Sequence, residues 1–198
     1  EHEVTLKARD FLLTTIRQDG SWPIDTDLSS WLTTLASNAL VEAGALSEAE
    51  CDELARIIRE RQIKHIHPFT GAEPGGWGWT DLSGSVPDAD DTSAALIALA
   101  KLQPGKVTSE VEDGLKWLMK LMNRNGGVPT FCRGWGFLPF DRSCPDISAH
   151  AFKAFALWRE HVAAGLAVQL DKSMGKIIKY LRHARDNDGV WCPLWFGD

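Results

Sequence analysis

The chain has 198 residues, of which 44% are hydrophobic and 24% are charged, and its formal net charge at pH 7 is −6. This length is sufficient for one substantial domain with a buried core, and the acidic balance, without any block of Lys and Arg, excludes a dedicated nucleic-acid-binding protein. No signal peptide and no long apolar run is visible, and the four cysteines lack CxxC spacing, so we expect a reducing, cytoplasmic setting.

Hydrophobic periodicity predicts seven helices and no convincing strand. Glycines and Pro-Gly pairs separate these segments, and Ser47 with Glu50 predicts a capping box at the start of the third helix. The predicted helices lie near residues 4–18, 27–44, 47–66, 89–103, 107–124, 145–164 and 169–186.

The predicted helices are of two kinds, which alternate along the chain. The second, fourth and sixth are almost free of charge: residues 28–41 and 92–100 carry none, and residues 147–157 carry only Lys153 besides His150. The others are amphipathic and charged. Because a helix that is apolar on all sides is buried and a striped helix covers it, the alternation predicts an all-α fold of helical hairpins, with inner and outer helices forming an α/α toroid. We expect one domain over residues 1–198.

Trp is unusually common, with nine residues against a single Tyr, and several Trp residues belong to a weak repeat. The segments "IRQDGSW", "EPGGWGW", "NRNGGVP" and "RDNDGVW" align on Trp22, Trp77, Val128 and Trp191, which are 55, 51 and 63 residues apart. Such a period is typical of arrays of similar units. We expect these glycines to end the outer helices and these Trp residues to pack across the helix ends.

The segment "VPDADDTSAALIAL" (86–99) places Asp88, Asp90 and Asp91 directly before an apolar helix. Like charges at short range keep one carboxyl protonated at neutral pH, and the positive end of a helix stabilises the conjugate base. The pattern thus fits an acid that faces an apolar cavity. Two structural interpretations stay open: a helix N-cap, and a Ca²⁺ or Mg²⁺ site, although the later Gly and Glu of an EF-hand loop are absent.

Four ordered segments resemble squalene-hopene cyclases and related triterpene cyclases: "QDGSW" (18–22), "GGWGWTDLSGSVPDADDTSAAL" (75–96), "PDISAHAFKAF" (145–155) and "DGVWCPLWFGD" (188–198). The first is similar to the QW motif of these enzymes and the second to their DxDD motif. The resemblance covers nearly the whole chain. It implies a partial (α/α)6 barrel with prenyltransferase and squalene oxidase repeats, and terpenoid biosynthesis as the setting. The implied activity is that of an isomerase, a class II terpene cyclase.

The resemblance also implies roles for individual residues. Asp90 would protonate a linear polyprenoid such as squalene, with Asp88 and Asp91 flanking it and His150 pairing with the acid. On the residues alone, His150 equally fits a buried structural histidine. No metal and no cofactor are expected. The residues implied in the substrate pocket are Trp31, Trp79, Phe131, Asp146 and Trp195, of which the four aromatic ones equally fit a core.

Several features of the chain depart from the family pattern. A complete toroid has six hairpins, so we expect this chain to be a fragment that is inactive alone, with exposed inner helices that promote self-association. Leu32, Val128, Gly84 and Ser85 stand where the family has other residues, which leaves the substrate open.

Two other functions remain as alternatives: a class II diterpene cyclase that acts on a prenyl diphosphate, and a non-catalytic α/α toroid that binds a lipid or a protein. For a polyprenoid cyclase, we expect peripheral membrane contact through the full-length protein.

Overall fold

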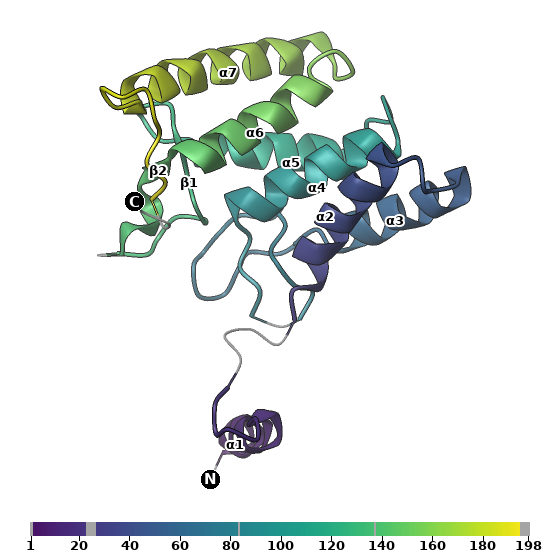
Figure 1. Ribbon diagram of the computed structural model, residues 1–198, viewed down its shortest axis with the longest axis vertical. Helices are drawn as coiled ribbons and strands as arrows, with labels where there is room; N and C mark the ends of the chain where they lie inside the picture. Colours follow the sequence, from purple (N-terminus) through teal and green to yellow (C-terminus); the bar gives the residue numbers. More distant parts are fainter. Residues whose placement is uncertain (1, 23–26, 83, 137, 195–198) are drawn as a thin grey trace.

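The computed structural model describes residues 2–22, 27–82, 84–136 and 138–194, and its regular structure is almost entirely helical (Figure 1). All seven predicted helices are present. Their bounds are α1 (Glu3–Thr15), α2 (Ser29–Glu42), α3 (Glu48–Glu60), α4 (Ala89–Leu102), α5 (Ser109–Leu121), α6 (Pro145–Trp158) and α7 (Ala164–Ala184).

Between α5 and α6 the chain forms two short strands, β1 (Val128–Pro129) and β2 (Ser143–Cys144), and the 3-10 helix η1 (Pro139–Asp141). The strands pair antiparallel, with Val128 opposite Cys144. The prediction of no strand was wrong at this point, because two residues are too few to show an alternating pattern.

The helices α2 to α7 form two layers, which confirms the predicted alternation. In the inner layer α4 packs against α2 on one side and α6 on the other, while α3, α5 and α7 pack on the outer side (Figure 1). Two hydrogen bonds show the relative direction of α4 and α6. Asp90 is hydrogen-bonded to His150, and Leu96 O accepts from the indole of Trp158. These pairs are 60 and 62 residues apart, so the two inner helices run parallel.

The centre of the core is α4, in which every residue from Asp91 to Leu99 is buried. Its alanines allow the neighbouring helices to approach closely, and Leu96, Ile97 and Leu99 supply most of the apolar area. Such a helix needs partners on all sides, and α2, α3, α5 and α6 provide them. The prediction of a helix that is apolar all round is therefore confirmed for α4.

The inner helix α2 differs from this expectation. Its buried residues are Ser30, Thr34 and Ser37, whereas Leu32 and Leu35 are about half exposed, at 54% and 47%. Periodicity alone does not reveal which side of an uncharged helix meets a neighbour. In the described part of the chain, most apolar residues on this side of α2 are exposed.

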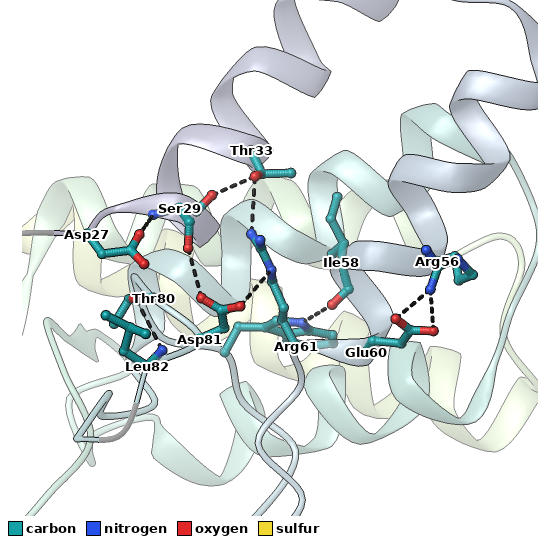
Figure 2. Close-up of polar contacts among 11 residues, drawn as sticks. Asp27, Ser29, Thr33, Arg56, Ile58, Glu60, Arg61, Thr80, Asp81 and Leu82 are labelled. Carbon is teal, nitrogen blue, oxygen red and sulfur yellow. Dashed lines mark hydrogen bonds and ion pairs between the residues drawn. The ribbon is translucent and has the colours of Figure 1, made fainter.

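Polar contacts hold the beginning of α2 against the loop before α4 (Figure 2). The Ser29 hydroxyl donates to Asp81 at 3.1 Å, and Thr33 accepts from Arg61, the C-cap residue of α3, also at 3.1 Å. The Arg61 guanidinium lies 3.9 Å from the Asp81 carboxylate. This network therefore joins α2, α3 and the loop around residue 81.

The helix α1 does not form the predicted outer cover, because it has no buried residue and stands apart from the other helices (Figure 1). Its apolar residues, including Leu6, Leu12 and Leu13, are spread around the helix instead of forming one stripe. If α1 packed against the other helices with one side, part of these apolar residues would remain exposed. None of the helices described is long and apolar enough to cross a membrane.

The repeat has a structural basis in the indole N–H groups of its Trp residues. Trp22, Trp77 and Trp191 each donate to a carbonyl in the last turn of the preceding helix, at Leu12, Ile58 and Leu181, each at 2.7 Å. The last carbonyls of a helix lack partners within the helix, so the indole satisfies one of them. In the third repeat, which has Val128, the side chain of Arg133 donates to Leu121 O at 2.6 Å.

Candidate active site

The three aspartates lie at the beginning of α4. Asp88 is the N-cap residue, and Asp90 and Asp91 lie in the first turn. The extended backbone of Asp88, with φ −135° and ψ 165°, ends the preceding loop, and its carboxylate accepts from the backbone N–H of Asp91 at 2.7 Å. The backbone N–H of Asp88 donates to Trp77 O at 2.9 Å. The N-cap interpretation thus holds for Asp88, and the cap orients the two acids that follow it.

Two of the three carboxyls are buried, with Asp88 2% and Asp91 6% exposed. Burial raises the pKa of Asp91 to about 6, because a carboxylate loses hydration in the interior. Burial, and then the neighbouring charge of Asp91, raises the pKa of Asp88 well above its usual range. Asp88 and Asp91 thus readily hold protons that exposed aspartates would release near pH 4.

The third carboxyl, Asp90, has a different environment. Its side chain is 41% exposed, and its Oδ1 lies 2.7 Å from Nδ1 of His150, whose side chain is 32% exposed. The acid and the imidazole come from two parallel inner helices and are 60 residues apart in the chain. The structure therefore brings Asp90 and His150 together, and Asp90 is more exposed than the two buried acids beside it.

Hydroxyl groups and glycines hold the chain around this turn. Thr92 Oγ1 accepts from the backbone N–H of Trp77 at 2.9 Å, and Ser148 Oγ accepts from that of Val128 at 2.8 Å. These contacts attach α4 and α6 to the preceding loops. A Cβ on Gly78 would lie 2.3 Å from Ser85 Oγ and 2.5 Å from Val86 O, so only glycine permits the close approach of this loop.

Two of the predicted pocket aromatics lie at the beginning of α2. Trp31 is exposed on α2, and Trp79 is half-buried against the core. The backbone N–H groups of Ser30 and Trp31 both donate to Trp79 O, at 3.0 and 3.2 Å. The carbonyl of Trp79 thereby serves the first turn of α2, whose N-cap residue Leu28 makes no side-chain capping hydrogen bond.

Phe131 lies beside the first turn of α4, because the carbonyl of the preceding Thr130 accepts from the backbone N–H of Ala89 at 3.2 Å. Its ring packs against two aromatic residues that the sequence analysis did not single out: Phe140 at 5.0 Å, edge to face, and Trp135 at 5.7 Å. The concentration of aromatic residues between 131 and 140 is the sequence signal that could have identified them.

Of the other two predicted pocket residues, Asp146 makes no hydrogen bond to the three acids within the described structure. Asp146 is exposed in the first turn of α6, and its carboxylate accepts from the Cys144 thiol at 2.6 Å. It lines an open groove of about 480 Å³ with Ala149, Leu181 and Trp191. Trp195 lies outside the described residues.

The arrangement can hold and deliver a proton at one position. Asp90 is accessible from the inner layer and paired with a base, while the neighbouring carboxyls are buried where protonation is favoured. Within the described ranges, no group of three His, Cys, Asp or Glu side chains has an arrangement that could hold a metal ion.

The family model described as the squalene-hopene cyclase C-terminal domain matches residues 28–197. Among individual relatives, sporulenol synthase from Bacillus subtilis is 31% identical over 178 residues, which are 83% of this chain and 28% of that protein. Enfumafungin synthase from Hormonema carpetanum is 25% identical over 92% of this chain and 16% of that protein. The chain thus spans well under a third of these relatives' length.

A solved structure of a variant of the type II terpene cyclase MstE from Scytonema, in complex with geranylgeranyl dihydroxybenzoate as substrate, has the same fold. Its TM-score is 0.59 at 20% identity, over 98% of this chain and 53% of that one. The likeness supports the α/α fold predicted from the alternation of helices. On the match of the family model to more than half of its residues, the chain belongs to the squalene-hopene cyclase C-terminal domain family.

Proposed function

We propose that this chain forms the acid-bearing part of a class II terpene cyclase, in which Asp90 protonates an alkene of a linear polyprenoid such as squalene. The observation that carries the proposal is the 2.7 Å contact between Asp90 and His150, next to two buried carboxyls. Family membership and the cyclase names of the relatives support it.

An isolated alkene is a weak base, so its protonation requires an acid stronger than an ordinary carboxyl. When both ring nitrogens of His150 carry protons, Nδ1–H donates to Asp90 Oδ1. The carboxylate that remains after proton transfer is then paired with an imidazolium, which stabilises it. The positive end of α4 adds to this effect, because Asp90 lies in the first turn.

The substrate becomes a carbocation once the proton is transferred, and an aromatic face stabilises a cation without attacking it. Each such contact contributes about 0.5–2 kcal/mol, depending on desolvation. We assign this role to Trp31, Trp79 and Phe131. Trp135 and Phe140 support the Phe131 ring through the packing described above. Trp195 belongs to the same proposal on the family resemblance alone.

The substrate class is tested by incubating the protein that contains this chain with squalene, geranylgeranyl diphosphate and a geranylgeranyl-bearing phenol, and analysing the products by mass spectrometry. We expect a cyclic product from squalene, with the mass of the substrate. Cyclisation of geranylgeranyl diphosphate alone would favour the diterpene cyclase alternative.

The role of Asp90 is tested in the same protein with Asp90→Asn, and with Asp113→Asn as the control because Asp113 is an exposed aspartate on the outer helix α5. We expect Asp90→Asn to lower turnover by at least about 100-fold, since general acid catalysis contributes this much. Asp113→Asn should leave turnover unchanged. Full activity of Asp90→Asn would contradict the proposal and favour another acid.

A further inference from the structure

A small cavity lies between α2 and α4, next to the buried acid Asp91. Measured as the space open to the centre of a water molecule, its volume is about 10 Å³. A space of this size is near the minimum that admits one water molecule, and a buried water needs about two to four polar partners. Half of its lining is apolar, from Ile58, Trp77, Gly78 and Ala95, and the other half consists of Ser30, Thr34, Arg61 and Asp91.

Two polar atoms of this lining are buried without a hydrogen-bond partner. They are Oγ of Ser30, a residue 4% exposed, and Oδ1 of Asp91, a residue 6% exposed. An unsatisfied polar atom in the interior is costly and rare in folded proteins. Thr34 Oγ1 donates to Trp31 O at 2.9 Å and keeps lone pairs that can accept a further hydrogen bond.

We propose that this cavity is a binding site for one water molecule, which donates to Asp91 and is held by the hydroxyls of Ser30 and Thr34. The site offers three polar partners, the number that buried water molecules typically have. It also explains why α2 buries hydroxyl groups against α4 although apolar residues are available on its other side.

The water would act on the acid cluster through Asp91. A hydrogen bond donated to a carboxylate stabilises its charged form and lowers its pKa. The charged groups around Asp91 are Asp88 and Asp90 on its own turn, His150 from α6, and Arg61 from the end of α3. Residues 29–41 of α2 carry no charge, so α2 would influence the ionisation of Asp91 through the proposed water. Only its consequence for catalysis rests on the proposed function.

The Arg61 side chain also lines this cavity, and its guanidinium has other partners. Figure 2 shows its guanidinium between Thr33 and Asp81, at 3.1 Å from Thr33 Oγ1 and 3.9 Å from Asp81 Oδ2. These contacts engage the guanidinium, and the Asp88 side chain contacts the Asp91 carboxyl. Asp91 Oδ1 still has no hydrogen-bond partner among the described protein atoms, so the proposed water would supply one.

The proposal is tested on this chain without any turnover measurement, by a crystal structure that resolves ordered water and by an NMR titration of the Asp91 carboxyl carbon. We expect density for one water within hydrogen-bond distance of Ser30 Oγ and Asp91. Ser30→Val places methyl groups in the cavity and displaces the water, so the titration midpoint of Asp91 should rise by about one pH unit.

Two further variants keep the test decisive. Ser30→Ala removes one partner of the water with little steric change and should raise the midpoint by less than Ser30→Val. Ser37→Ala removes another buried, unpartnered hydroxyl from the same side of α2, but Ser37 does not line the cavity, so the midpoint should stay unchanged. A wild-type cavity without water density, or equal midpoints in the Ser30 and Ser37 variants, would overturn the proposal.

Discussion

The inner helices α4 and α2 both contain a long uncharged stretch, residues 92–100 and 29–41, but they bury opposite kinds of side chain. In α4 every residue from Asp91 to Leu99 is buried, so its leucines stabilise the core. In α2 the buried residues are two serines and a threonine, and its apolar side chains are exposed. The difference shows that an uncharged sequence predicts that a helix packs against others. Which of its side chains become buried depends on where those neighbouring helices lie.

The largest expected difference between the two helices is the loss of stability when one leucine on each is truncated. Leu96 on α4 is fully buried and Leu35 on α2 is 47% exposed. We expect Leu96→Ala to lower the free energy of unfolding by about 2–5 kcal/mol and Leu35→Ala to change it by less than about 0.5 kcal/mol, as measured by urea unfolding of this chain. Equal losses would mean that the exposed side of α2 is covered in solution.

The next effect concerns Asp91, whose pKa of about 6 exceeds the value near 3.9 of an unfolded aspartate. Between these pH values the folded state binds more protons than the unfolded state, so the free energy of unfolding falls as pH rises from about 4 to about 6. The loss is about 3 kcal/mol for a difference of two pH units.

Asp91→Asn removes this ionisation. We therefore expect the variant to be more stable than the wild type at pH 8, by up to about 3 kcal/mol, and to lose this advantage below about pH 4. Urea unfolding at both pH values measures the difference, with Asp113→Asn on the exposed side of α5 as the control. A constant difference between Asp91→Asn and wild type at all pH values would disprove the linkage.

Packing around α4 can also be tested from α5. A Cβ on Gly114 would lie 2.7 Å from Cζ3 of Trp77 and 3.2 Å from Cδ2 of Leu96, whereas one on Gly175 in α7 meets no atom within 4 Å. We expect Gly114→Ala to destabilise the protein by about 1–3 kcal/mol and Gly175→Ala to stabilise it by up to about 1 kcal/mol, since alanine is the better helix former. Thermal unfolding measures both changes. Stabilisation of both variants would refute the packing argument.

The smallest effect on stability is expected on the exposed side of α2, where the prediction of self-association can be tested. The double variant Leu32→Gln with Leu35→Gln should leave stability nearly unchanged but shift the chain toward the monomer in sedimentation velocity. The matched control is Val168→Gln with Ile178→Gln, which alters two exposed apolar residues of α7. Unchanged association in the α2 variant would place the contact elsewhere.

The order of the helices and their inner and outer layers could be predicted from the sequence, because charge and periodicity differ between the two kinds. The end of α3 could not: residues 61–66 continue the helical pattern, but the helix ends at Glu60 and Ile63 N–H donates to Gly76 O at 2.9 Å. The position of α1 was also missed, because helicity does not show what a helix packs against.

At the candidate site, the family resemblance paired Asp90 with His150, and these side chains lie in contact. Asp88 and Asp91 are buried whereas Asp90 is not, and this burial depends on the loop around Trp77 and on α2. The spacing of the aspartates alone could not reveal it. Trp135 and Phe140 were missed because their contacts with Phe131 arise in an irregular loop, which has no period to read.

The origin of the transferred proton tests the central claim most directly. The protein that contains this chain is equilibrated in D₂O and allowed to cyclise squalene, and the product is analysed by mass spectrometry. If the exchangeable acid of Asp90 starts the reaction, the product carries one deuterium at the protonated carbon. A cyclic product without deuterium would contradict proton-initiated cyclisation.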